Sequence, residues 1–294
     1  MKDLLSLKLY ARVARLGSFS AAARECDLAQ SQVSRMIAEL EAGLGARLLA
    51  RTTRAVTPTE AGQRFLAQVE PILAALEDAE NSVRETGELR GLLRVGMPST
   101  LAISIVFPSL PSFAEAHPHL RIEIMLDDRN QDMVKEAVDI GIRVGRLPDA
   151  TGTSKLIGRM RRVIVASPTY LARYGTLQVP SDIERHRIVF GPAAMQSSSW
   201  QFQRDGQMVQ VALRPHVSTN DTAGAVAAAA SGLGITSSTS WGCRRELNEG
   251  ALTRLLPDWE MAELPVHAYF PMGRATRMAA RSFVEFITEK LHDD

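Results

Sequence analysis

Three short helical segments follow one another within the first 41 residues, and this pattern constrains the fold more than any other feature of the sequence. Apolar residues recur at helical spacing in the opening segment. A second helix is expected over 19–26 and a third over 31–41, with a turn at 27–30 between them. Ala22 and Ala23 are small enough to let two helices cross closely. The sequence therefore predicts a helix-turn-helix unit.

The third helix has one apolar face and one polar face. Its polar face carries short or bidentate hydrogen-bonding side chains near the helix N-terminus, namely Ser31, Gln32, Ser34 and Arg35. Side chains of this kind at this position read base edges in a major groove. A basic, hairpin-like wing follows over 43–54, and its Arg51 and Arg54 can reach phosphates or a minor groove. Residues 1–64 hold ten Lys or Arg and six Asp or Glu, which is the excess that phosphate contact requires. A three-helix packing module with a solvated polar face is the alternative interpretation.

A heptad pattern follows the wing. Thr57–Glu60 combine a capping box with proline at the first helical position, and Gly87–Gly91 end the helix as a hinge. The apolar residues are spaced alternately four and three apart: Phe65, Val69, Ile72, Leu76, Ala79 and Val83. A seam of this regularity is typical of pairing with a second helix. We therefore predict a DNA-binding unit over 1–57 and a linker and dimerisation helix over 58–90. Packing of this helix on its own chain is the alternative.

From residue 91 onward, strand and helix patterns alternate, which predicts α/β lobes with mainly parallel sheets. Ligands of such sheets bind beyond the carboxyl ends of the strands, next to helix N-termini. The candidate effector-binding residues at these positions are Ser99, Thr100, Arg143, Gly145, Asn220, Thr222 and Thr236. Ordinary strand-to-helix capping is the alternative role for each of them. For Arg143 the alternative is a salt bridge to Asp139 or Asp127. The hydroxyls and Arg143 favour a small carboxylate as the ligand.

Composition and the motifs that the chain lacks exclude several classes of protein. The sequence has 34 Lys or Arg against 33 Asp or Glu, two cysteines, and neither a membrane-length apolar run nor a secretory signal. A soluble, reduced, cytoplasmic protein that does not act at a membrane is expected. It has no nucleophile-elbow, phosphate-loop or zinc-protease motif, and its six histidines are scattered. We therefore predict no catalytic residues, metal ligands or cofactor. An enzyme and a solute-binding protein are the alternatives.

The chain resembles the LysR-type transcriptional regulators over essentially its full length. The residues that carry the resemblance most specifically lie in the first 62 positions: Gly17–Ala23, Gln30–Arg35, Leu40-Glu41, Leu44-Gly45, Arg51–Arg54 and Thr57–Gly62. Looser matches follow at Gly91–Val95, Asp139–Arg143, Ser167–Leu171 and Gly232–Ile235. Ser237–Thr239 depart from the pattern, because the family often has a Leu-Pro pair after the Gly-x-Gly turn.

The resemblance implies an α+β multidomain protein. It would have a winged helix-turn-helix, a long linker helix and a two-lobed α/β effector domain over 91–294 like that of periplasmic binding proteins. It also implies that the last helix returns to the first lobe, so that lobe I comprises 91–163 with 268–294 and lobe II comprises 164–267. DNA contacts would fall on Gln30, Ser31, Gln32, Ser34, Arg35, Arg51 and Arg54. The implied partners are promoter DNA, a small-molecule effector, further copies of the chain in a dimer and tetramer, and RNA polymerase if the protein is an activator.

Overall fold

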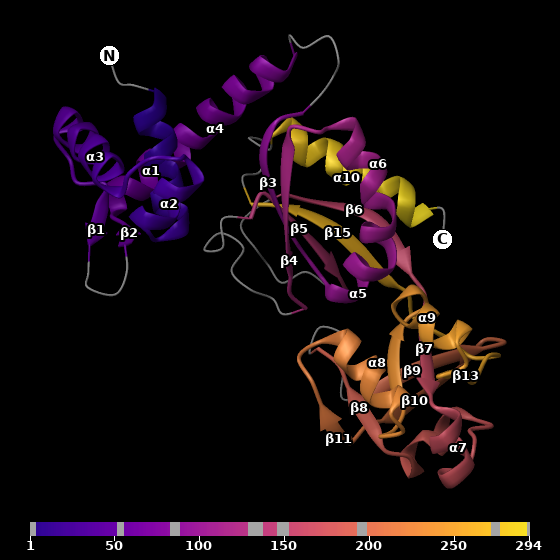
Figure 1. Cartoon of the computed structure of the whole chain (residues 1–294). Coiled ribbons are helices and arrows are strands. Elements are labelled where there is room, and N and C mark those ends of the chain that lie inside the picture. Colours follow the sequence, from indigo (N-terminus) through magenta and orange to yellow (C-terminus); the bar gives the residue numbers. More distant parts are fainter. Residues whose placement is uncertain are drawn as a thin grey trace.

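The computed structural model describes residues 4–51, 56–82, 89–128, 138–145, 153–192, 199–271 and 277–292. Figure 1 shows three bodies in succession, which we call the head, lobe I and lobe II. The head is joined to lobe I by a long helix, and lobe I is joined to lobe II by two crossings of the chain. Of the predicted hinge at Gly87–Gly91, residues 87 and 88 lie outside the described residues.

The head contains three helices and a two-stranded wing. Its elements are α1 (Leu4–Leu16), α2 (Phe19–Glu25), α3 (Gln30–Leu44), β1 (Leu49–Arg51) and β2 (Val56–Pro58), and the two strands are antiparallel. Gly17 ends α1 with a positive φ of 61°, and the Ser18 hydroxyl caps α2 by accepting from the amide of Ala21. Ala22, Val33 and Ile37 are fully buried where the helices meet. The predicted helix-turn-helix is confirmed.

The linker helix α4 (Glu60–Ser82) begins later than the sequence suggests. Pro58 pairs with Leu49 in the wing, so it lies in a strand and not in the first turn of the helix. Thr59 provides the cap instead, because its hydroxyl accepts from the amide of Gly62. The predicted capping box at Thr57 is therefore wrong: pairing of the wing strands keeps residues 56–58 extended.

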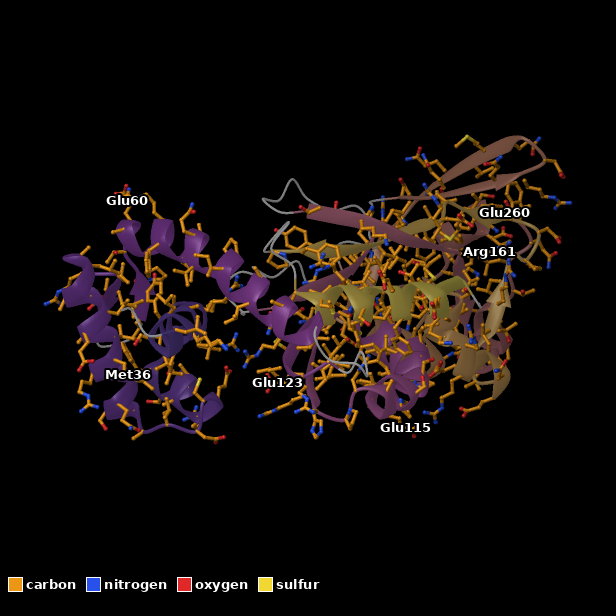
Figure 2. All side chains as sticks on the ribbon, turned by 90° about the horizontal axis from the view of Figure 1, so that it is seen from above. Met36, Glu60, Glu115, Glu123, Arg161 and Glu260 are labelled. Carbon is orange, nitrogen blue, oxygen red and sulfur yellow. The ribbon has the colours of Figure 1, made fainter. Side chains whose placement is uncertain are left out.

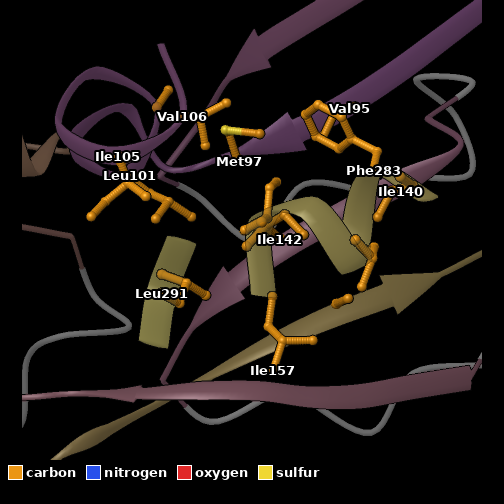
Figure 3. Packing of buried hydrophobic residues seen from close by; sticks show 14 of the residues in the cluster. Val95, Met97, Leu101, Ile105, Val106, Ile140, Ile142, Ile157, Phe283 and Leu291 are labelled. Carbon is orange, nitrogen blue, oxygen red and sulfur yellow. The ribbon is translucent and has the colours of Figure 1, made fainter. Parts of the chain in front are cut away.

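Lobe I is a five-stranded sheet with helices packed on it. Its elements are β3 (Gly91–Met97), α5 (Ser99–Leu101), the π-helical turn η1 (Ala102–Val106), α6 (Phe107–Ala116), β4 (Leu120–Leu126), β5 (Ile140–Val144), β6 (Thr153–Met160), β15 (Leu264–Phe270) and α10 (Met278–His292). The strand order is β4-β3-β5-β15-β6. Figure 3 shows Val95 and Ile142 of the sheet packed against Phe283 of α10, and all three are fully buried. The last helix thus returns to lobe I, as the resemblance implied.

Lobe II is built from three small sheets. Its elements are β7 (Arg162–Ala166), α7 (Pro168–Tyr174), the 3-10 helix η2 (Pro180–Arg185), β8 (Ile188–Phe190), β9 (Ser199–Arg204), β10 (Gln207–Ala212), β11 (Pro215–Ser218), α8 (Thr222–Ala230), β12 (Thr236–Thr239), the 3-10 helix η4 (Trp241–Cys243), α9 (Arg244–Asn248), β13 (Thr253–Leu255) and β14 (Glu260–Met261). The sheets have the orders β12-β7-β13, β10-β9-β14 and β11-β8.

The sheets are mixed, so the expectation of mainly parallel sheets is wrong. In lobe I, β4, β3 and β5 are parallel, but β15 runs antiparallel to both β5 and β6. Among the paired strands that the structure describes in lobe II, β8 and β11 are parallel and the other pairs are antiparallel. The cause is the double crossing: the chain leaves lobe I after β6 and comes back as β15, which enters the sheet in the reverse direction. The expected lobe boundaries are also shifted. The boundary after residue 267 falls inside β15, a lobe I strand that starts at Leu264. The first strand of lobe II, β7, starts at Arg162, two residues before the expected start at 164.

Candidate DNA-binding and effector sites

The N-terminal turn of α3 presents a row of polar side chains to solvent. Gln30, Ser31, Gln32 and Arg35 are exposed, and Ser34 is half-buried. Between them Val33 and Ile37 point into the head core, which fixes the rotation of the helix about its axis. All five predicted base-reading residues of α3 therefore lie on one helical element, with four of them open to solvent.

The polar row on α3 has few restraints from neighbouring side chains. Ala29 precedes the helix and offers no side-chain cap, and its carbonyl accepts from the amides of Gln32 and Val33. From α2, the Ser20 hydroxyl donates to Gln30 Oε1 over 3.1 Å, which orients that amide side chain. Arg35 Nε lies 3.7 Å from Glu39 Oε1, a loose pair whose side chains are 72% and 70% exposed. Little desolvation or restraint opposes a swing of Arg35 towards a base.

The wing supplies the second part of the DNA-facing surface. Arg51 lies in β1, where its backbone is opposite Val56 of β2. Arg54 lies outside the described residues, as do positions 52, 53 and 55. Arg47, which immediately precedes the wing strands, is exposed. The carbonyl of Arg47 accepts from the Thr59 hydroxyl over 2.7 Å, so the base of the wing is fixed to the start of α4.

The linker helix is bonded tightly to the head at its N-terminal end and open further along. The Tyr10 hydroxyl donates to the carbonyl of Gly62 over 2.8 Å, and burial raises the pKa of Tyr10. Arg15 Nε and Glu70 Oε1 form a 2.5 Å ion pair with both side chains less than 15% exposed. Within the seam, Val69 is buried, whereas Ile72 is 57% exposed. The half of α4 beyond residue 70 therefore presents apolar surface that its own head does not cover.

The Asp128 carboxylate bonds to both lobes where they meet. Asp128 follows the end of β4, and its Oδ1 accepts from the amide of Ser99 over 2.8 Å. Its Oδ2 accepts from the amide of Thr222, at the start of α8 in lobe II, over 2.6 Å. The Ser99 hydroxyl in turn donates to Asp221 Oδ2 over 2.6 Å. Two predicted effector residues, Ser99 and Thr222, are thus brought together from positions more than 120 residues apart.

The other predicted effector residues have contacts of their own. Thr100 is buried where α5 packs against α8 and η4. Arg143 is 8% exposed, and its Nη1 donates to the carbonyl of Asp127 over 3.3 Å. Asp139, one of the two salt-bridge partners considered for Arg143, pairs with Arg277 over 2.9 Å. The placement of the remaining three is as follows: Gly145 has φ +99°, Asn220 is exposed beside α8, and the fully buried Thr236 hydroxyl donates to the carbonyl of Val189.

Asp128 is a contact residue that the sequence reasoning missed. The signal was present, because Asp127-Asp128 follow a strand in the position where we looked for ligand-binding residues after other strands. Arg162, at the crossing between the lobes, was missed as well. Its Nη2 donates to Ser237 Oγ over 3.0 Å, and burial lowers its pKa to about 10. Both residues are polar groups within or beside the join between the lobes.

Neither thiol has the properties of a reactive cysteine. Cys243 is fully buried, and burial raises its pKa to about 12. Burial and the neighbouring Glu25 carboxylate raise the pKa of Cys26. Both therefore stay protonated at neutral pH. The part of the chain that the structure describes contains no group of three or more His, Cys, Asp or Glu side chains that could hold a metal ion, and none of its helices is long and apolar enough to cross a membrane.

A helix-turn-helix head joined to a two-lobed domain defines a DNA-binding protein with a separate sensory part, and comparison with known proteins gives the family. Residues 4–63 match the model of the bacterial regulatory helix-turn-helix protein, lysR family, and residues 86–292 match the LysR substrate binding domain. The chain belongs to the LysR family of transcriptional regulators. Members of this family are regulators of transcription, so the chain is not an enzyme.

Relatives and solved structures agree along the whole chain. An uncharacterised transcriptional regulator of Haemophilus influenzae is 31% identical over 93% of this chain and 96% of its own length. The regulator PtxR of Pseudomonas aeruginosa is 29% identical over 98% and 93%. The structure of CrgA, a LysR-type regulator of Neisseria meningitidis, is 28% identical with a TM-score of 0.61, covering 98% of each chain. The full-length virulence activator AphB of Vibrio cholerae is 26% identical with a TM-score of 0.58, covering 98% of this chain and 99% of that one.

Proposed function

We propose that this regulator binds promoter DNA as an oligomer and that a small carboxylate bound between its lobes changes how it binds. The observation that carries the proposal is the Asp128 carboxylate, which accepts from the amides of Ser99 and Thr222 in two different lobes. Those donors form a site shaped for a carboxylate, since both oxygens are bonded and each lobe supplies one partner. An effector carboxylate replaces Asp128 on these amides and keeps the lobes together by contacts of its own.

The further residues proposed for the effector are the other strand-end and helix-start positions predicted from the sequence. They are Thr100, Arg143, Gly145, Asn220 and Thr236, together with Ser99 and Thr222. The buried guanidinium of Arg143 supplies positive charge, which offsets the desolvation of an incoming anion. Only an effector that binds one arrangement of the lobes more tightly than the other can shift the protein between them.

For DNA, the proposed contacts are Gln30, Ser31, Gln32, Ser34 and Arg35 in the major groove, with Arg51 and Arg54 of the wing on the backbone. The exposed polar row on α3 supports this assignment. The exposed Ile72 and Ala79 on the seam of α4 support a dimer through the linker helices. A tetramer, and contact with RNA polymerase if the protein activates, belong to the same proposal. Because promoter DNA is the partner, we place the protein in the cytoplasm.

Capture of fragmented host DNA by the full chain, followed by sequencing, tests the DNA-binding part. Arg35→Ala is the test variant and Arg64→Ala is its matched control. Arg64 makes the same kind of surface pair, with Glu60 four residues away, and its side chain is 71% exposed, against 72% for Arg35. The account predicts that wild type and Arg64→Ala enrich the same short dyad and that Arg35→Ala relaxes it, losing roughly 1–3 kcal/mol of discrimination. Identical enrichment in all three removes Arg35 from the reading surface.

Chemical rescue tests the effector site. Asp128→Ala removes the side-chain carboxylate and leaves Cβ, so an added small carboxylate (formate, which matches the lost group in size, or the larger acetate) should bind the vacated donors and raise the melting temperature of this variant more than that of wild type. Asp182→Ala is the control, because Asp182 also accepts two backbone amides but does so within lobe II, at an exposed site. Equal effects of acetate on both variants would show that the bridge is not a carboxylate site.

A further inference from the structure

Four charged side chains meet where the head touches lobe I. Glu25, the last residue of α2, accepts from Arg12 Nε over 2.8 Å and from Arg12 Nη2 over 2.6 Å. From lobe I, Arg94 Nη2 donates to Glu25 Oε1, and Arg94 Nε donates to Glu123 Oε2 over 2.8 Å. Figure 2 places Glu123 at the edge of lobe I that faces the head. We call Arg12, Glu25, Arg94 and Glu123 the head–lobe cluster.

The cluster is largely shielded from water, unlike an ordinary surface ion pair. The side chain of Arg94 is 8% exposed and that of Glu25 is 17% exposed. Charged groups this far from solvent interact more strongly than exposed ones and are screened less by salt. Charges of opposite sign alternate in the order Arg12, Glu25, Arg94 and Glu123, and the 32% exposed Glu123 also pairs with the exposed Arg121 over 3.0 Å. Removing Glu25 from Arg94 would leave the buried guanidinium with one carboxylate instead of two.

Lobe I holds Arg94 in place without help from the head. The backbone amide of Arg94 donates to Asp139 Oδ2 over 2.8 Å, and Asp139 Oδ1 accepts from Arg277 Nη2 over 2.9 Å. Arg277 also donates to the carbonyl of Leu92 over 2.9 Å. Because β3 and the segment before α10 are fixed to each other here, lobe I offers Glu25 a preformed docking position.

The strands that carry the cluster also carry the bridge between the lobes. Arg94 and Glu123 are directly paired in the parallel ladder of β3 and β4. Five residues further along the chain lie Ser99, in α5, and Asp128, two residues past the end of β4; they bond to each other and, through Thr222, to lobe II. The ladder itself ends at Met97 and Leu126, so at about 3.3 Å per residue roughly 10 Å of paired strand leads from the cluster towards the bridge. A shift of Asp128 at one end of this ribbon therefore moves the backbone of Glu123 and Arg94 at the other.

We propose that lobe I docks the DNA-binding head of its own chain through Glu25 and Arg94, and that β3 and β4 couple this docking to the Asp128 bridge between the lobes. The coupling half rests on the effector site proposed above. Docking restrains α2, and α2 contacts the recognition helix through Ser20 and Gln30. The route from effector to DNA then runs through the body of one protomer, in addition to the linker helix.

Distance measurement between paired spin labels tests the docking. Labels are attached to cysteines introduced at the exposed Arg24 and Glu115, in the full chain with Cys26→Ser, and without DNA or effector. The doubly labelled chain is diluted into excess unlabelled chain, so that distances between copies do not contribute, and wild type should then give one narrow distance distribution. Glu25→Gln and Arg94→Met should each broaden it towards longer distances, and the double variant should add nothing further. Two controls should leave the distance distribution unchanged. Arg12→Met spares the bond between head and lobe I, and Glu60→Gln removes an exposed carboxylate elsewhere.

Identical distributions for wild type, Glu25→Gln and Arg94→Met would refute the docking. Equal broadening by Arg12→Met would refute it too, because it would show that the change comes from within the head. For the coupling, Asp128→Ala should broaden the distribution as Glu25→Gln does, while Asp182→Ala should not. An unchanged distribution in Asp128→Ala refutes the coupling and leaves the docking standing. The acetate rescue of Asp128→Ala is measured separately, so failure of the effector site is distinguishable from failure of this inference.

Discussion

Substitution of Gly62 by alanine tests how the linker helix is attached to the head. Gly62 is buried in the first turn of α4, and a Cβ at this position would lie 2.0 Å from the carbonyl oxygen of Leu48. The obstacle is backbone, so α4 and the start of the wing must separate. Separation stretches two hydrogen bonds, from Tyr10 to the Gly62 carbonyl and from the Thr59 amide to the Leu48 carbonyl. Each contributes about 1 kcal/mol net.

The expected net effect is a destabilisation of the head by about 2–4 kcal/mol. Overpacking strain adds roughly 1–3 kcal/mol to the two weakened bonds, and the better helix propensity of alanine offsets about 1 kcal/mol. Hydrogen exchange of the α1 amides in the full chain measures this, since about 3 kcal/mol corresponds to exchange roughly 100-fold faster. Gly43→Ala is the matched control: Gly43 is helical and exposed, and an added Cβ meets no atom within 4 Å.

Gly43→Ala should stabilise the head by about 0.5–1 kcal/mol, because only the helix propensity changes. If Gly62→Ala leaves the exchange of α1 unchanged or slows it as Gly43→Ala does, the close approach between Leu48 and α4 is not a constraint. The reasoning about the attachment of the linker helix would then be refuted.

Three further predictions concern other parts of the chain. Glu70→Gln should destabilise the head by about 2 kcal/mol in the same exchange assay, because it leaves the largely buried Arg15 without its partner charge. This value lies between those for exposed and for buried ion pairs. An effect below about 0.5 kcal/mol would contradict the prediction. Phe283→Ala should cost about 3–5 kcal/mol, measured as faster exchange in α10 and β3, because the ring is fully buried against Phe113 and Phe286; slower or equal exchange would contradict this. Burial lowers the pKa of His186, so its neutral form favours the fold: the stability it contributes is complete above the ordinary pKa of about 6.5 and declines as pH falls through that value towards the lowered one. Between pH 7.5 and 5, the melting temperature of His186→Asn should therefore fall less than that of wild type. An equal fall in both would contradict the assignment.

Features that depend on neighbouring residues were predictable from the sequence. The sequence predicts strands over 120–126, 140–144 and 162–166 and a helix over 168–174, which are the bounds of β4, β5, β7 and α7, because β-branched runs and the Ser167-Pro168 cap determine them locally. The polar row on α3 was predictable for the same reason: the apolar positions Val33 and Ile37 fix which face is buried. Such signals act within a single turn or strand.

Features that depend on distant pairings were not predictable. The direction of β15 is set by its return from lobe II, and nothing within Leu264–Phe270 distinguishes a parallel from an antiparallel strand. The Asp128 bridge joins residues 94 positions apart, and the contact between Glu25 and Arg94 joins residues 69 apart. The start of α4 was misplaced because pairing of Pro58 with Leu49 overrides a local capping pattern. In each case a partner elsewhere in the chain decides.

The most direct test of the central claim, that the N-terminal face of α3 reads a major groove, is dimethyl sulfate protection on the operator recovered by DNA capture. This reagent methylates guanine N7 in the major groove and adenine N3 in the minor groove, so one experiment distinguishes the two. The account predicts that wild type and Arg64→Ala protect guanine N7 within each half-site and that Arg35→Ala loses this protection while the protein still binds the DNA. Protection confined to adenine N3, or N7 protection unchanged in Arg35→Ala, would contradict it.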